Sequence, residues 1–85
     1  MARYFFHLRD HHDRLLDPDG VEIGDKSAIP GVALSEARAL IAAEAREGVI
    51  DLGQAIEVED ERGAVVHRLA FADAVRVVSP GSRQK

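Results

Sequence analysis

The chain has 85 residues, with 15 acidic and 11 basic side chains and a formal net charge of −4. Its length fits one domain, and a domain of this size buries roughly 60–65% of its unfolded surface, so we expect modest stability. The acidic balance argues against a general nucleic-acid binder, and the absence of cysteine excludes disulfides and thiolate metal sites.

We also expect no membrane-spanning segment and no signal peptide. No apolar run approaches the roughly 18 residues that span a bilayer. The opening MARYFFHLRD reaches charged residues too early for the apolar region of a signal peptide. We therefore expect a cytoplasmic protein without a membrane partner.

The segment Arg3–Arg9 (RYFFHLR) is the first predicted strand, because it is aromatic and alternates as a half-buried strand does. One face, predicted to meet the helix, consists of Tyr4, Phe6 and Leu8. The opposite, open face consists of Arg3, Phe5, His7 and Arg9. Phe5 either contacts another chain or is partly covered by a loop or the tail, and the pattern leaves both readings open.

A returning segment follows the first strand. Arg14–Asp17 can form a short second strand, and Val21–Ile23 is extended again. Between them, Asp17-Pro18-Asp19-Gly20 predicts a turn, since proline fixes φ at the second position and glycine supplies a positive φ at the fourth. The loop 24–30 has no periodicity, and we expect it to be mobile.

The longest periodic segment, Gly31–Gly48, predicts a helix. Its covered stripe repeats at three- and four-residue spacing and comprises Leu34, Ala37, Ile41 and Ala45. Glu44 lies at the edge of this stripe, and we expect its carboxylate to reach water rather than to be buried and paired. Gly48 is the natural stop, because glycine takes the left-handed conformation that closes a helix.

A second hairpin is predicted after the helix. An apolar connector, expected to pack over the helix end, comprises Val49, Ile50 and Leu52. Ala55–Glu59 alternates as a strand with Ile56 and Val58 inward. The acidic residues Glu57, Glu59, Asp60 and Glu61 are explained by a solvated hairpin around the glycine-containing loop 60–63.

The final segments are less regular. Ala64–Ala70 is the returning strand, and its buried face is either Val65, His67 and Leu69 or Val66, Arg68 and Ala70. Phe71–Val75 predicts a helical turn, and the polar stretch 79–85 (SPGSRQK) is expected to be a disordered tail. We therefore divide the chain into one domain, 1–78, and the tail.

This order of elements predicts the fold class. Two antiparallel hairpins on either side of one helix indicate an α+β two-layer sandwich. We expect a four-stranded antiparallel sheet with one main helix, in the order β-β-α-β-β, followed by a short C-terminal helical turn. One face of this sheet is covered by the helix and the other is open.

Chemistry-bearing groups are sparse. His7, His11 and Asp13 have the side chains that a metal site uses, but their spacing falls on a strand and a turn, where neighbouring side chains diverge. The calcium-loop pattern around Asp17 fails where Leu15 and Lys26 stand. No nucleophile elbow or phosphate loop is present. We expect no cofactor, no metal and no enzymatic activity.

Several segments together carry a resemblance. They are R-Y-F-F-H-L-R-D at 3–10, the Asp-x-x-Gly turn at 17–20, I-P-G-V-A at 29–33, I-E-V-E-D-E-R-G at 56–63 and L-A-F-A-D-A-V at 69–75. The chain resembles a family of small bacterial proteins of unknown function, and because that family has no established activity, no catalytic residues can be carried over from it. In layout alone it is also similar to antitoxins of the HicB type, although no DNA-binding segment follows the domain.

The first functional hypothesis is a non-enzymatic protein-interaction or regulatory module that acts as a homodimer. Its predicted interaction surface comprises Arg3, Phe5, His7 and Arg9. The alternative is an antitoxin-like binder of a small basic protein or of RNA, through the acidic hairpin 57–61 or a basic patch of Arg3, Arg9 and Arg14. A third hypothesis is a small metal-dependent enzyme that uses His7, His11 and Asp13.

Overall fold

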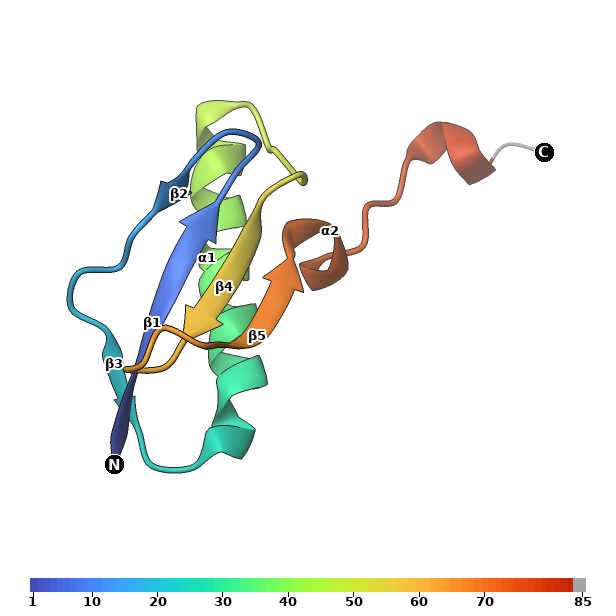
Figure 1. The fold of residues 1–85 in the computed structure, drawn as a ribbon. Coiled ribbons are helices and arrows are strands. Elements are labelled where there is room, and N and C mark those ends of the chain that lie inside the picture. Colours follow the sequence, from blue (N-terminus) through green and yellow to red (C-terminus); the bar gives the residue numbers. More distant parts are fainter. Residues whose placement is uncertain (84–85) are drawn as a thin grey trace.

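The structure is a computed structural model that describes residues 1–83, and it is an antiparallel sheet covered on one face by one long helix (Figure 1). The strands are β1 (Ala2–Arg9), β2 (Arg14–Leu15), β3 (Val21–Ile23), β4 (Ala55–Glu59) and β5 (Val65–Ala70). The helices are α1 (Ile29–Glu47) and α2 (Phe71–Ala74), with 3₁₀ turns η1 (Lys26–Ala28) and η2 (Pro80–Arg83). The predicted α+β class, with one main helix and a short C-terminal helical turn, is confirmed.

One edge of the sheet is split between two short strands. β1 pairs with β4 on one side, and β4 pairs with β5. On its other side β1 pairs with both β2 and β3, through Leu8 opposite Leu15 and Tyr4 opposite Val21. The two pairings differ by two residues in register, so residues 16–20 bulge out of the sheet edge.

The core lies between the sheet and α1. The predicted inward face of β1 is confirmed, because Tyr4, Phe6 and Leu8 all pack in or against this core. From α1 the buried side chains are Ile29, Ala33, Ala37 and Ile41. Two of these four are alanines, so the helix backbone can approach the sheet closely.

Helix α1 starts two residues earlier than predicted, at Ile29. Pro30 stands in its first turn, where the missing backbone N–H costs nothing. The predicted stop is confirmed. Gly48 caps the helix with φ +98°, and its N–H donates to the carbonyls of Glu44 and Ala45.

The predicted covered stripe of α1 needs correction at its C-terminal end. Ala45 is exposed, and Glu44 takes the covered side instead. Glu44 is half-buried, and its carboxylate accepts hydrogen bonds from the Asp51 N–H at 3.0 Å and from Gln54 Nε2 at 2.7 Å. The expectation of a solvated Glu44 was therefore wrong, because this side chain holds the connection between α1 and β4.

The apolar connector after α1 also differs from the prediction. Val49 and Ile50 are 74% and 46% exposed, so they do not pack over the helix end. Only Leu52 packs partly against the core. The hydrogen bonds of Glu44 shape this connection, and its apolar residues are left at the surface.

The open question about the last strand is resolved by its register. In β5, His67 lies opposite Val58 and Leu69 opposite Ile56, so His67 and Leu69 face α1. A register shift between Val58 and Glu59 then pairs Val65 with Glu59, so Val65 does not continue this inward face, and Val65 and Val66 are both exposed.

The chain then enters α2, where Phe71 is fully buried and its N–H donates to the Gln54 carbonyl at 2.8 Å. Arg38 Nε donates to the Ala74 carbonyl at 2.8 Å, which fastens α2 to α1. Val75 still packs against the core, and the segment 76–83 after it leaves the body of the domain (Figure 1).

Residues Pro80–Arg83 form η2, and residues 84 and 85 of the predicted disordered tail lie outside the described residues. The division into a domain and a disordered tail stays a prediction. No helix within residues 1–83 is long and apolar enough to cross a membrane.

Candidate functional site

The sheet face opposite α1 carries the predicted interaction residues. We call it the open face, and its side chains are Arg3, Phe5, His7, Arg9, Arg14, Glu57, Glu59 and Arg68. Alternation along each strand and the register between strands bring them to one side. Arg3 contributes at the far end, where it pairs with Glu22 at 2.8 Å.

Two carboxylates form the centre of the open face. Glu57 and Glu59 expose only 12% and 16% of their side chains. Around Glu57 lie Arg9 Nε at 3.0 Å, Arg68 Nε at 3.4 Å and Arg14 Nη1 at 3.5 Å. The carboxylates are thus covered by guanidinium groups, and the open face is rich in arginine although the whole chain is acidic.

Arg14 links the two carboxylates, because its Nη1 also donates a hydrogen bond to Glu59 Oε2. This charged hydrogen bond is the main reason that the pKa of Glu59 lies below its ordinary value. The expected solvated hairpin is therefore wrong for Glu57 and Glu59, which are held in ion pairs. It remains right for Glu61, which is exposed in the loop.

His7 lies beneath the surface of the open face, with 6% of its area exposed. Its Nδ1 accepts a hydrogen bond from the Asp17 N–H at 3.0 Å, and its Nε2 lies 3.3 Å from Glu59 Oε1. The first contact assigns the ring proton to Nε2, which therefore donates to Glu59. His7 supports the open face rather than offering a contact surface.

Asp17 replaces a missing strand partner at the split edge. Its Oδ2 accepts from the Phe6 N–H at 3.2 Å, and its Oδ1 accepts from the N–H groups of Asp19 and Gly20. Burial opposes ionisation of this carboxylate, but the backbone donors Gly20, Phe6 and Asp19 outweigh it and lower the pKa of Asp17.

Phe5 is half-buried, which agrees with the reading that a loop partly covers it, whereas the contact with another chain stays a prediction. Its ring stacks on His7 at a centroid distance of 6.3 Å. A Cβ added at Gly20 would lie 2.9 Å from Phe5 Cε2 and 2.8 Å from Arg3 Cγ. The turn at Gly20 therefore packs against Phe5, which is partly covered by a loop of its own chain.

The three histidine-cluster residues are not brought together. His7 contacts Glu59, whereas His11 Nε2 lies 3.3 Å from the Asp51 carboxylate, and Asp13 is exposed in the turn. Within residues 1–83 no group of three or more histidine, cysteine, aspartate or glutamate side chains has the arrangement to hold a metal ion.

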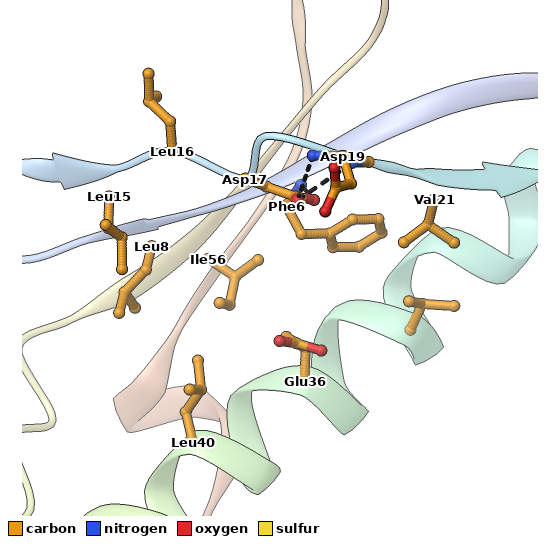
Figure 2. Close-up of a pocket in the computed structure, with 12 residues that line it drawn as sticks. Phe6, Leu8, Leu15, Leu16, Asp17, Asp19, Val21, Glu36, Leu40 and Ile56 are labelled. Carbon is orange, nitrogen blue, oxygen red and sulfur yellow. Dashed lines mark hydrogen bonds between the residues drawn. The ribbon is translucent and has the colours of Figure 1, made fainter.

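The second surface is an apolar groove beside the split edge, between α1 and β2–β3 (Figure 2). We call it the edge groove. Its volume is about 420 Å³, and its apolar lining comprises Phe6, Leu8, Leu15, Leu16, Val21, Val32, Leu40 and Ile56. Leu15, Leu16 and Val21 are 70%, 58% and 43% exposed.

The edge groove has an acidic rim. The side chains of Asp19, on the turn, and Glu36, on α1, line it together with Asp17 (Figure 2). Asp17 is occupied by backbone donors. Neither Asp19 nor Glu36 has a cationic partner in the part of the chain that the structure describes. The groove therefore combines an apolar floor with two unpaired carboxylates.

Sequence reasoning missed the edge groove and half of the open face. Glu57, Glu59 and Arg68 could have been assigned to the open face once Ile56 and Val58 were placed inward. The groove had a weaker signal, which was the pair Leu15 and Leu16 in a strand too short to bury both. Its cause is the register shift between β2 and β3, which no local pattern encodes.

Comparisons with known proteins add one finding. A protein-family model described as "Domain of unknown function (DUF6894)" matches residues 3–72. The match runs from β1 into α2 and therefore includes the open face and the edge groove, but not the segment 76–83. No curated protein and no solved structure matches the chain significantly.

Proposed function

Because the chain belongs to the family described as a domain of unknown function (DUF6894), which brings no activity with it, we propose a function from the two surfaces of the domain. The protein is a non-enzymatic interaction or regulatory module that acts as a homodimer. The observation that carries this proposal is the edge groove with its exposed rim of Leu15, Leu16 and Val21.

The area available supports a dimer. A stable interface buries roughly 800 Å² on each partner. The chain exposes 5924 Å², so such an interface would take about one seventh of its surface. Burying the groove rim would remove apolar area from water, which is the main driving force of association.

The ionisable groups support a non-enzymatic role. On the open face, Glu57 and Glu59 both form ion pairs with Arg14, and His7 contacts Glu59. None of these three ionisable residues lines the edge groove. A general acid or base needs a side chain directed at a substrate in a pocket.

Sedimentation equilibrium tests the proposal. We expect the wild-type chain to form dimers at micromolar to high micromolar concentration. Leu15→Asp should shift the population to monomer, because it places a charge on the groove rim. Val49→Asp is the matched control, since Val49 is similarly exposed but lies outside the groove. A wild-type chain that stays strictly monomeric at several hundred micromolar would contradict the homodimer.

A second candidate rests on the arginine layer of the open face and on the layout shared with HicB-type antitoxins. Arg9 and Arg68 are 44% and 55% exposed above Glu57. This arrangement favours an anionic partner such as RNA over a small basic protein, because the carboxylates of the acidic hairpin are covered. Pull-down from a lysate distinguishes the candidates, since only this one predicts a stoichiometric foreign partner that Arg9→Ala and Arg68→Ala release and salt weakens.

A further inference from the structure

The segment after α2 is an arm that stands away from the domain. It comprises residues 76–83, which follow the core-packed Val75, and Figure 1 shows it leaving from the side of β5 and α2. The radius of gyration is 14.6 Å, whereas a compact chain of this length is expected near 12 Å. The arm therefore does not fold back over the sheet.

The arm carries two apolar side chains that remain mostly exposed to solvent. Val77 and Val78 are 73% and 59% exposed. Arg76 precedes them, is exposed, and has no anionic partner in the described part of the chain. Residues 76–83 (RVVSPGSR) contain two basic residues and no acidic one. The arm thus combines an apolar pair with positive charge.

The edge groove offers the complementary chemistry. Its floor is apolar, and within residues 1–83 the carboxylates of Asp19 and Glu36 on its rim have no cationic partner. Valine side chains would bury apolar area against Leu15 and Leu40, and a guanidinium would meet a carboxylate at the edge of the contact.

The arm and the groove lie at opposite edges of the sheet. The arm leaves beside β5, and the groove opens beside β2 and β3, with β1 and β4 between them (Figure 1). To reach its own groove the arm would have to turn back and cross the sheet or α1. The arm can reach the edge groove of a second copy without turning back over its own domain.

We propose that the arm of one copy binds in the edge groove of a second copy, with Val77 and Val78 against the apolar floor and Arg76 paired with Asp19 or Glu36. The inference rests on the proposed homodimer and identifies the segment that joins its two copies. Each copy then supplies an arm and accepts one.

Full-length variants test this contact by sedimentation equilibrium. The double variant Val77→Asp/Val78→Asp should raise the dissociation constant at least tenfold, and Val49→Asp should leave it unchanged. Arg76→Glu should weaken the dimer, and a second change, Glu36→Lys, should restore part of the loss. Circular dichroism verifies that each variant keeps the fold.

A mixing experiment tests the direction of the contact. The Val77→Asp/Val78→Asp chain keeps its groove, and the Leu15→Asp chain keeps its arm. Each should be mainly monomeric alone, and a mixture should associate with one arm–groove contact intact. Mixtures that remain monomeric while the wild type dimerises would overturn the inference.

Disulfide capture tests the position, because the natural chain contains no cysteine. Chains carrying Val77→Cys and Leu15→Cys should cross-link to each other on oxidation, whereas Arg62→Cys, in the distant hairpin loop, should not join to Val77→Cys. In the double variant, a cross-link formed only within one chain would show that the arm returns to its own groove and would overturn the second copy as partner.

The outcomes separate the two proposals. A wild-type chain that is strictly monomeric overturns the homodimer and the arm contact together. A dimer that survives Val77→Asp/Val78→Asp but is lost with Phe5→Asp on the open face overturns the arm contact and leaves the homodimer standing.

Discussion

At the scale of single residues, Gly20 and Asp17 hold the split edge together. Gly20 adopts φ +72° and lies against Phe5 and Arg3. Asp17 supplies to Phe6 the acceptor that a regular strand would have given. The turn therefore does two things at once, since it reverses the chain and completes the hydrogen bonding of β1.

The position of Gly20 predicts an unusually costly substitution. Gly20→Ala should destabilise the fold by about 2–4 kcal/mol, because the new Cβ adds a steric overlap to the left-handed backbone. Gly63→Ala is the matched control. Gly63 has φ +84° but nothing within 4 Å of an added Cβ, so its cost should be only about 1 kcal/mol. Urea unfolding compares them, and equal costs would contradict the packing against Phe5.

The lowered pKa of Asp17 predicts how its contribution varies with pH. The folded pKa lies below the unfolded value near 3.9, so the ionised carboxylate stabilises the fold. This contribution is fully present above about pH 5 and is lost as the pH falls through 4 and below. The difference in unfolding free energy between wild type and Asp17→Asn should therefore shrink on acidification. Glu61→Gln, in an exposed loop, is the control and should show no such trend.

At the scale of elements, the connection between α1 and β4 is held by polar contacts. Glu44 binds the Asp51 N–H and the side-chain amide of Gln54, and Gln54 is 7% exposed. The Gln54 carbonyl in turn accepts from Phe71, so the same corner positions α2. The Glu44 carboxylate thus positions the residues before β4 and, through Gln54, the start of α2 at the end of β5.

This arrangement predicts different effects of two glutamates on one helix. Glu44→Ala should cost about 1–3 kcal/mol, because it leaves the Asp51 N–H and the buried Gln54 amide without their acceptor. Glu47→Ala, one turn further on and exposed, should stay within about 0.5 kcal/mol of wild type. Chemical denaturation measures both, and a neutral Glu44→Ala would mean that water replaces the carboxylate.

The elements with a local signal were predictable, and those fixed by distant contacts were not. The end of α1 at Gly48 follows from glycine alone, and the inward face of β1 follows from alternation. Glu44 was misjudged because its partners come after the helix has ended. Glu57 looked like a solvated hairpin residue because its partner Arg9 is far away in sequence and meets it only through the β1–β4 register.

At the scale of the whole molecule, the proposed dimer couples association to stability. Unfolding of a dimer releases two chains, so the melting temperature rises with protein concentration. For a unit of this size we expect about 3–5 °C per tenfold increase. The Val77→Asp/Val78→Asp variant should melt at a temperature that does not depend on concentration. Differential scanning calorimetry over two decades of concentration measures both, and a wild-type transition that does not move would count against the dimer.

The placement of the arm and the edge groove at opposite edges of the sheet has a consequence for symmetry. If two copies exchange arms reciprocally, a twofold axis relates them and assembly stops at two. If each copy passes its arm to the next and accepts one from the previous, the contact is head-to-tail, and growth ends only when a ring closes. The proposed homodimer therefore requires the reciprocal exchange about a twofold axis, and the head-to-tail contact would give open growth instead.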